Sequence, residues 1–315
     1  MDGIIVVRKE RGYTSNDVVA KLRGILRMKK IGHTGTLDPE AEGVLPVCLG
    51  QATKLVDLIA DVDKEYRAVL RLGIVTDTQD LASNASVLSE LSPEEVREKV
   101  TREDALRAVR SFEGEYDQVP PMYSAIKQDG RKLYELAREG RVVERRARRV
   151  EIFGIEPEKI DLPELTILVR CSKGTYIRTL CSDIGERLGV GGAMASLVRT
   201  RVGSFALGDA LTLGEIGNLA RTRDGTRTEE VLWDRLPVRP LESFFADCPA
   251  LSAKEEADRL LKNGNPLKKE NLSGDFSPAG DKRVRMCDST GKFCGLYRYQ
   301  PEKGMFFPEK MFLGI

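Results

Sequence analysis

Strand-like and helix-like segments follow one another in irregular order along this chain, and no other property of the sequence limits the fold as strongly. Residues 3–7 form a short β-type run, and residues 65–72 alternate apolar and polar side chains as a half-buried strand does. Helical stripes lie over residues 18–26, 92–112 and 175–188. Because strands and helices do not alternate one for one, this order predicts an α+β fold rather than a doubly wound α/β fold.

A domain boundary is expected near Pro237 and Pro240, which bracket an apparent break in the pattern. The chain has 315 residues, a length that suits two domains. Beyond the two prolines, a capped helix is expected over residues 252–261, followed by short strand-like runs between turn residues. We therefore expect a large domain over residues 1–240 and a small β-rich domain over residues 241–315.

Charge and histidine content exclude some functions and leave others open. Lys and Arg total 50 while Asp and Glu total 49, so the net charge of +1 gives no global signal for nucleic acid or a membrane surface. The single histidine, His33, excludes metal sites built from clustered histidines. A hydrolase relay would have to use this same residue, and the sequence has no nucleophile-elbow motif.

Cysteine usage indicates a reducing compartment. No two of the six cysteines form a Cys-x-x-Cys pair and several lie in apolar runs, so buried free thiols are favoured over disulfides or zinc ligands. The apolar run near the first residue is too short for a signal peptide, and no segment approaches the length of a membrane span. We expect a cytoplasmic protein.

The loop over residues 30–39 contains the only histidine and an aspartate, Asp38, fixed by the following Pro39. Glycines at positions 32, 35 and 43 allow tight turns or close approach of a ligand, and Pro39 keeps Asp38 out of the helical region. Such a loop can present one carboxylate to a substrate. The same residues can instead form an Asx-turn that only closes the loop, and taken alone they favour that turn.

Residues 32–54 strongly resemble the catalytic motif of the TruB family of tRNA pseudouridine synthases, with Gly-His-Thr-Gly-Thr-Leu-Asp-Pro at 32–39 and Gly-Val-Leu-Pro-Val at 43–47. Further segments match in the family's order, and the resemblance covers about residues 3 to 240. These segments are Lys64-Glu65-Tyr66, Thr76-Asp77-Thr78 with Asp80, residues 118–125 (Gln-Val-Pro-Pro-Met-Tyr-Ser-Ala) and residues 171–180 (Cys-Ser-Lys-Gly-Thr-Tyr-Ile-Arg-Thr-Leu).

The tail over residues 241–315 resembles, more weakly, the PUA-type RNA-binding domain that follows the catalytic domain in bacterial members.

Two departures from the family pattern occur in the first domain. Glu10 replaces the usual proline of the N-terminal motif, and Leu81-Ala82-Ser83-Asn84 stands where the acidic loop usually ends in glycine. Neither position carries the central chemistry, so we expect differences in loops rather than a loss of activity.

The resemblance implies a mixed, largely antiparallel central sheet flanked by helices, and it implies a cofactor-free, metal-free isomerisation of the T-loop uridine at position 55 of tRNA. Asp38 is the implied catalytic carboxylate, which either attacks C1′ or abstracts the C2′ proton. Arg178 would keep it ionised and oriented. Tyr66 would stack on the uracil and remove the C5 proton. Arg178 could instead be a surface residue of a first helical turn, but a cation is mildly unfavourable near the positive end of a helix, so a specific partner is favoured. An isolated strand tyrosine such as Tyr66 is more often ordinary packing.

RNA binding is expected to come from local features, since a stacked base has to be extruded before it can react. The resemblance implies that His33 fills the vacated stack or holds a neighbouring base, although a hydrogen-bonded loop histidine is the alternative. The basic tract over residues 131–149 is expected to contact phosphates, extended by Lys29, Lys30, Arg199 and Arg201. The residues expected to bind RNA are His33, Thr36, Lys64, Leu197, Tyr176, Lys30, Arg138, Arg141 and Arg146, with Leu197 as an apolar wall against the base.

The expected partner is the tRNA T-stem-loop, with no membrane, no required protein partner and a monomeric enzyme. Two alternatives stay open. A non-catalytic RNA-binding chaperone would not need Asp38, Tyr66 and Arg178 together. A guide-RNA-dependent relative in a ribonucleoprotein would be inactive on naked tRNA.

Overall fold

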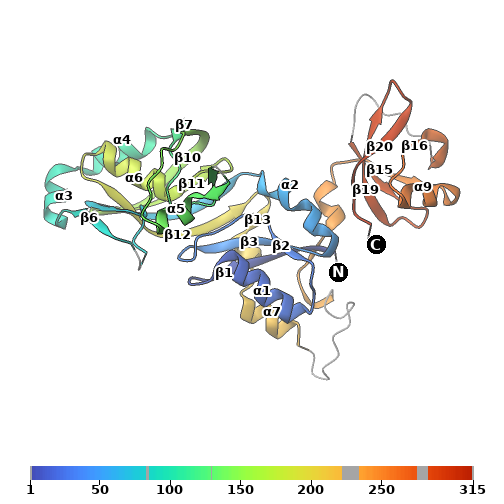
Figure 1. Cartoon of the computed structure of the whole chain (residues 1–315), viewed down its shortest axis with the longest axis horizontal. Coiled ribbons are helices and arrows are strands. Elements are labelled where there is room, and N and C mark those ends of the chain that lie inside the picture. The colour runs from blue at the N-terminus through green and yellow to red at the C-terminus, as the bar shows by residue number, and fades with distance from the viewer. Residues whose placement is uncertain (1, 83–84, 129, 222–233, 275–282, 314–315) are drawn as a thin grey trace.

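The computed structural model describes residues 2–82, 85–128, 130–221, 234–274 and 283–313. Ser83 and Asn84, where the acidic loop departs from the family pattern, lie outside these ranges. Strands and helices intermix throughout the first 240 residues, and a second unit follows at the C-terminal end (Figure 1). This confirms the predicted α+β class. Among the described residues, no helix is both long enough and apolar enough to cross a membrane.

Ten strands of the described chain form one large sheet, whose path runs β14-β1-β3-β12-β4-β11-β10-β7, with β2 paired to β3 and β13 to β12. All of these pairs are antiparallel except that between β3 and β12, so the sheet is mixed and largely antiparallel as expected. The strands are β1 (Gly3–Lys9), β2 (Ile31–His33), β3 (Glu42–Leu49), β4 (Lys64–Leu72), β7 (Gly114–Gln118), β10 (Arg148–Asp161), β11 (Glu164–Cys171), β12 (Gly192–Val202), β13 (Phe205–Ala206) and β14 (Arg239–Pro240).

The helices of the first unit begin where the sequence supplies caps. Thr14 with Asp17, Ser92 with Glu95 and Thr101 with Asp104 each form a capping box, which satisfies backbone N–H groups that a helix start leaves without partners. The helices are α1 (Ser15–Leu26), α2 (Val56–Ala60), α3 (Pro93–Lys99), α4 (Arg102–Arg110), α5 (Leu133–Arg138), α6 (Ile177–Arg187) and α7 (Leu213–Leu219), with 3₁₀ turns η1 (Gly50–Leu55) and η2 (Leu207–Asp209). Two small hairpins join β5 (Ile74–Thr76) to β6 (Val87–Glu90) and β8 (Lys127–Gln128) to β9 (Arg131–Lys132).

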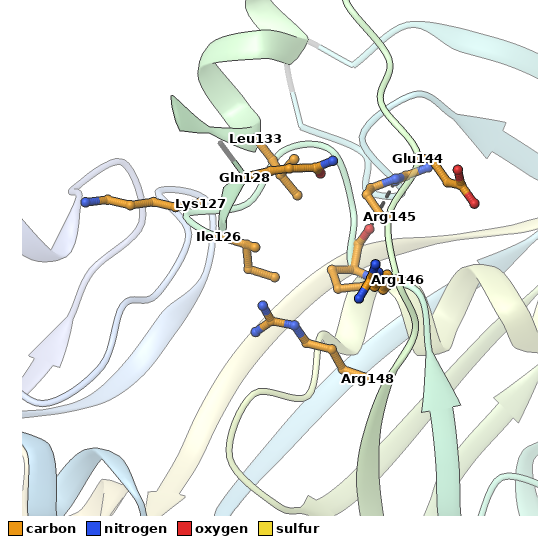
Figure 2. A pocket seen from close by; sticks show the side chains of 9 residues that line it. Ile126, Lys127, Gln128, Leu133, Glu144, Arg145, Arg146 and Arg148 are labelled. Atoms are coloured by element: carbon orange, nitrogen blue, oxygen red, sulfur yellow. Dashed lines mark hydrogen bonds between the residues drawn. The ribbon is translucent and has the colours of Figure 1, made fainter. Parts of the chain in front are cut away.

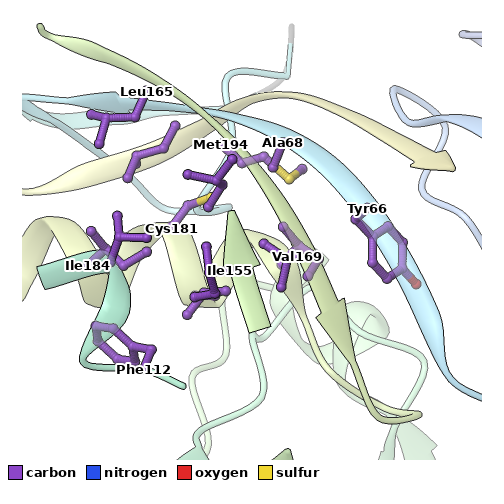
Figure 3. Packing of buried hydrophobic residues seen from close by; sticks show 14 of the residues in the cluster. Tyr66, Ala68, Phe112, Ile155, Leu165, Val169, Cys181, Ile184 and Met194 are labelled. Atoms are coloured by element: carbon purple, nitrogen blue, oxygen red, sulfur yellow. The ribbon is translucent and has the colours of Figure 1, made fainter. Parts of the chain in front are cut away.

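Two hydrophobic cores lie under the two halves of this sheet. One joins the inward side chains of β4, β11 and β12 to helices α4 and α6, and Tyr66 lies at its rim with the hydroxyl turned away from the other apolar groups (Figure 3). The other joins β1 and β3 to α1 and α7. The halves meet where β3 and β12 run parallel, at the pairs of Val198 with Glu42 and Arg199 with Gly43. A cavity lined by residues of both halves opens beside this junction.

The C-terminal unit contains a six-stranded sheet in the order β16-β20-β19-β18-β15-β17, a curved β arrangement that fits a PUA-type domain (Figure 1). The helix expected over residues 252–261 was wrong at its start. Ser252 pairs with Ser273 and Cys287 inside β15, and the helix begins only at Asp258. The elements are β15 (Ala250–Ala253), β16 (Leu267–Lys268), β17 (Leu272–Ser273), β18 (Arg283–Cys287), β19 (Phe293–Gln300), β20 (Met305–Met311), α9 (Asp258–Lys262), η3 (Leu241–Phe245), η4 (Glu255–Ala257) and η5 (Lys269–Asn271).

All six cysteines are free, and Cys48, Cys171, Cys181 and Cys294 are buried. This confirms the expectation of free thiols.

Candidate active site

Asp38 lies in a loop between β2 and β3 whose backbone is held by hydrogen bonds on several sides. The hydroxyl of Ser15 accepts from the Leu37 N–H (2.9 Å), and the Ala41 N–H donates to the Asp38 carbonyl (3.1 Å). The Gly12 N–H donates to the Pro39 carbonyl (2.9 Å). The loop therefore presents the Asp38 side chain, which is 39% exposed, at the edge of a cavity while its backbone is fixed.

Arg178 is the cation nearest to Asp38. It occupies the first turn of α6, but its side chain is only 7% exposed, so it is not the surface arginine that its position alone would allow. Its guanidinium lies 3.4 Å from the Asp38 carboxylate and 3.9 Å from that of Asp80, and it donates to the Tyr123 carbonyl (2.6 Å). A guanidinium between two carboxylates attracts both and fixes their orientation.

Asp80 is held in turn by its own loop. The hydroxyl of Thr78 donates to the carboxylate (2.6 Å), and the hydroxyl of Thr76 donates to the Asp80 carbonyl (2.8 Å). The neighbouring Gln79 has φ 64°, a left-handed conformation that side chains rarely adopt, and its amide oxygen accepts from the Thr179 hydroxyl (2.7 Å). The acidic loop is thus attached to α6 directly beside Arg178.

The cavity has a volume of about 660 Å³, and the three residues expected to be catalytic, Asp38, Tyr66 and Arg178, all line it. Leu197 also lines it from β12, beside β4 and Tyr66, as expected of an apolar wall. Burial raises the pKa of the Tyr66 phenol, while the positive charge of Arg199, its partner across β12 and β4, acts in the opposite direction. The cavity therefore combines a carboxylate, a guanidinium, a phenol and an apolar surface.

Besides Leu197, four of the residues expected to bind RNA line the same cavity: Thr36, Lys64, Tyr176 and Arg138. Lys64 is buried and donates to the carbonyls of Ala60 (2.8 Å) and Val62 (2.6 Å), and burial lowers its pKa to about 8. Tyr176 precedes α6, and Gln118 bonds both its N–H (2.8 Å) and its carbonyl (2.9 Å). These contacts make Lys64 and Tyr176 rigid parts of the wall.

His33 and Lys30 are not among the residues that line the cavity. His33 ends β2, and its Nδ1 accepts from the Gly35 N–H (3.4 Å). Burial and the nearby Arg199 lower the pKa of His33, which favours the neutral ring. Lys30 donates to the Gln51 side chain (3.1 Å) on the exposed surface. Both residues lie on β2 or next to it, at the edge of the catalytic loop.

The basic tract over residues 131–149 divides into paired and unpaired parts. Arg131 pairs with Glu139, and Arg149 pairs with Asp117 and Glu115 (both 3.1 Å). Arg146 lines a second cavity of about 510 Å³, which Figure 2 shows between the β8–β9 hairpin and the strand leading into β10. Arg141 is exposed and lines neither cavity. The other residues lining the second cavity are Pro120, Ile126, Lys127, Gln128, Leu133, Glu144, Arg145 and Arg148.

The expectation that Arg199 extends the basic surface was wrong. Its side chain is 1% exposed, and its guanidinium donates to the carbonyls of Val44 (2.7 Å), Gly35 (3.3 Å) and Thr36 (3.4 Å). Sequence reasoning also missed Lys9, which is fully buried and donates to the carbonyls of Ala41 (2.6 Å) and Pro39 (3.0 Å). The alternation of strands held a signal for both: each shares its face with a buried apolar residue two positions earlier, Leu197 and Val7.

Two family models match the chain. One, described as TruB family pseudouridylate synthase (N terminal domain), matches residues 23–177, and the other, described as tRNA pseudouridylate synthase B C-terminal domain, matches residues 178–246. A relative named tRNA pseudouridine synthase B from Lachnoclostridium phytofermentans is 47% identical over 326 residues, which cover 99% of this chain and 100% of that protein. One of the same name from Alkaliphilus oremlandii is 51% identical over 226 residues, covering 71% of this chain and 73% of that one.

Solved structures show the same architecture. An H/ACA RNP bound to a substrate RNA containing 2'-deoxyuridine has a chain that matches with a TM-score of 0.68 and 25% identity, covering 99% of this chain and 85% of that chain. A Cbf5-Nop10-Gar1 complex has one that matches with a TM-score of 0.68 and 27% identity, with the same coverage.

Proposed function

The chain belongs to the TruB family of pseudouridylate synthases, and from this membership we propose that it converts the T-loop uridine at position 55 of tRNA into pseudouridine. The single observation that carries the proposal beyond the family is the convergence of three side chains from distant parts of the sequence. The Asp38 carboxylate lies 3.4 Å from the Arg178 guanidinium, and both line one cavity with the Tyr66 phenol.

The reaction needs an extruded uridine, because a stacked base cannot reach the carboxylate. In the proposed pose, the ribose lies against Asp38 and the uracil lies between Tyr66 and Leu197. Asp38 acts either at C1′ or at the C2′ proton, and in both cases the N1–C1′ bond breaks. The base turns, C5 bonds to C1′, and the C5 proton leaves, for which the Tyr66 hydroxyl is the proposed acceptor. N1 takes up a proton, so the product is an isomer of the substrate.

The RNA around the target nucleotide is proposed to contact the residues at the rim of the cavity and beyond it. Thr36, Lys64, Tyr176 and Arg138 face the extruded nucleotide, and His33 fills the position that the base leaves in the stack. Lys30, Arg141 and Arg146 contact phosphates, for which several local cations suffice even in a chain with a net charge of +1.

We further propose that residues 1–240 are the catalytic domain and residues 241–315 an RNA-binding domain. Support comes from the separate six-stranded sheet of the second unit, whose first strand begins at Ala250. The enzyme is proposed to work as a monomer, without a protein partner, in the cytoplasm where tRNA is modified. The relatives named tRNA pseudouridine synthase B, which are 47% and 42% identical with 99% of this chain covered, support tRNA as the substrate.

The test of the catalyst is Asp38→Asn, which keeps the shape of the side chain and removes its charge. The variant should bind T-stem-loop RNA with the affinity of the wild type and release no tritium from uridine labelled at C5. Asp57→Asn on the exposed surface of α2 is the matched control and should react normally. Turnover by the Asp38 variant near the wild-type rate would refute the assignment.

A guide-dependent activity is the second candidate, because the matching solved structures are an H/ACA RNP and a Cbf5-Nop10-Gar1 complex. The deciding experiment uses purified full-length protein and unmodified tRNA transcript alone. We expect pseudouridine at position 55 without added protein or guide RNA. A requirement for either would favour the second candidate.

A further inference from the structure

Arg199 is a buried cation for which the proposed reaction has no assigned use. Its side chain is among the largest in the chain that are fully buried. Burying a guanidinium costs free energy unless its N–H groups are hydrogen-bonded. Here it donates to carbonyl oxygens of Val44, Gly35 and Thr36, which are dipoles rather than opposite charges. Among the described residues, no carboxylate forms an ion pair with Arg199, so its positive charge is not neutralised by a direct partner.

The partners of Arg199 connect two parts of the cavity. Gly35 and Thr36 lie in the loop that leads directly to Asp38, and a Cβ added at Gly35 would lie 3.8 Å from the Arg199 guanidinium. Arg199 also stands directly opposite Tyr66 in the pairing of β12 with β4, and both side chains line the cavity. One side chain therefore holds the loop that carries the carboxylate and lies beside the residue whose phenol is proposed to take the C5 proton.

We propose that Arg199 is a positioning residue that holds the Asp38 loop and the Tyr66 phenol in a fixed relation and supplies the positive charge that the phenol faces. The inference rests on the proposed function, because the relation of these two groups matters only for a reaction that uses both. Leu197 lies two residues earlier on the same face of β12, so the strand delivers the apolar wall and the cation together.

The charges around Tyr66 explain why this cation matters. Burial, Cys171 and Asp38 all raise the pKa of the phenol, and the positive charge of Arg199 lowers it. Lys9, His33 and Lys64 are the other titratable groups that interact with Arg199. Removing the guanidinium should leave burial and Asp38 unopposed, so that a smaller fraction of the phenol is ionised and able to accept a proton at neutral pH.

The first experiment measures the phenol directly, in full-length protein without RNA. Tyrosine is labelled with ¹³C at Cζ, the Tyr66 signal is assigned by its loss in Tyr66→Phe, and its titration is followed by NMR. Arg199→Met should raise the pKa of Tyr66 by about one unit or more, while Arg199→Lys should restore part of the shift. Arg67→Met is the matched control, since Arg67 is the neighbour of Tyr66 on β4 but pairs with Glu158 on the other face (2.6 Å).

The second experiment measures single-turnover rate and dissociation constant with T-stem-loop RNA. Arg199→Met should lower the rate about 100-fold, as a small displacement of reacting groups does, with little change in the dissociation constant. If Arg199→Met fails to fold, Arg199→Lys decides. A folded Lys variant with wild-type thermal stability should still react about tenfold more slowly, because one ammonium cannot span the loop and the phenol.

An unchanged Tyr66 titration in a folded Arg199→Met variant, or a wild-type rate in Arg199→Lys, would overturn the inference. These outcomes differ from failure of the proposed function. If the proposed function is wrong, the wild type releases no tritium from the labelled uridine. The titration still reports on the effect of Arg199 on Tyr66.

Discussion

At the scale of single residues, the active-site loop is held by two buried cations that bind backbone carbonyls. Lys9 reaches the carbonyls of Pro39 and Ala41 from β1, and Arg199 reaches those of Gly35 and Thr36 from β12. Asp38 lies between these two points of attachment. A carboxylate on a loop without other support would move too freely for chemistry, so fixed backbone on both sides is what gives Asp38 a defined position.

Replacing Asp80 by Asn tests the second carboxylate beside Arg178. The amide keeps an oxygen that can accept from the Thr78 hydroxyl, but it removes the charge 3.9 Å from the guanidinium. Asp38 is then the only carboxylate that pairs with Arg178 among the described residues. We expect the single-turnover rate to fall about tenfold, with RNA affinity unchanged. Asp77→Asn, in the same loop with its carboxylate facing the Ser86 N–H (2.7 Å), should have no such effect. If Asp80→Asn reacts at the wild-type rate, the Asp80 carboxylate does not contribute to the reaction.

The buried side chain of Lys9 should make the free energy of unfolding depend on pH in the alkaline range. Burial lowers its pKa from 10.5 to about 8, although Asp38, Glu42 and Glu40 oppose the shift and Arg199 adds to it. Between about pH 8 and pH 10.5, Lys9 binds more protons in the unfolded chain than in the folded chain. The free energy of unfolding that depends on Lys9 therefore increases as the pH rises through this range.

Urea unfolding at pH 8, 9 and 10 measures this effect as a difference between proteins, which cancels the other titrating groups. The free energy of unfolding of the wild type relative to Lys9→Met should increase by up to about 1 kcal/mol per pH unit. The exposed Lys99→Met should show no such slope. A constant difference across this range would mean that Lys9 does not titrate there.

At the scale of elements, the parallel pair of β3 and β12 decides where the catalytic groups meet. The loop carrying Asp38 leads directly into β3, and β12 supplies Leu197 and Arg199. The pair is short, and its closest approach is made at Gly43, which has φ 110°. A Cβ at Gly43 would lie 2.2 Å from the Arg199 carbonyl oxygen, so the strands can approach this closely only because residue 43 is glycine.

Substituting Ala at two glycines should therefore have opposite effects. Gly43→Ala should force β3 away from β12, lower the melting temperature and reduce activity more than RNA affinity. Gly24→Ala, inside α1 where a Cβ would meet nothing within 4 Å, should stabilise the chain by about 0.5–1 kcal/mol through helix propensity. Calorimetry of the two variants is the measurement. Equal melting temperatures would show that the β3–β12 contact can relax without cost.

At the scale of the whole molecule, the two units share one apolar core. Three phenylalanines of the C-terminal unit lie together: the ring of Phe245 lies 6.1 Å from that of Phe293 and 6.0 Å from that of Phe312. This cluster also contains Ile4 and Val44 of the large sheet. Lys54 adds a hydrogen bond to the Met311 carbonyl (2.8 Å). Such a contact restricts how the C-terminal unit can move relative to the active site.

Phe312→Ala should weaken this shared core. Truncation of a buried phenylalanine costs about 3–5 kcal/mol, and the ring is 4% exposed. We expect the C-terminal unit to become sensitive to protease before the rest of the chain, and tRNA affinity to fall while the single-turnover rate at saturation is retained. Phe153→Ala on the exposed side of β10, where the ring is 38% exposed, is the control. Intact resistance to protease in Phe312→Ala would show that the units are joined elsewhere.

Local sequence determined the class of the fold and most element starts, while the proposed catalytic set came from the resemblance to a family. Capping residues such as Thr14 and Ser92, and the alternation from Lys64 to Leu72, depend on neighbours a few positions away, which is why they could be predicted. The residues around Asp38 allowed either a reactive carboxylate or a simple turn. Resemblance to a family favoured the first, and the structure then placed Asp38, Tyr66 and Arg178 in one cavity.

Only the tertiary structure decided which charges are buried and what they hold. Strand alternation gave a signal that Arg199 and Lys9 share a face with buried residues, but their hydrogen-bond partners lie 155 and 32 positions away. His33 and Lys30, next to the catalytic loop in sequence, do not line the cavity. Ser252 looked like a helix cap and became part of a strand because Ser273 and Cys287 pair with it. The reason is the same in each case: burial and strand pairing depend on contacts between distant segments, which no local pattern specifies.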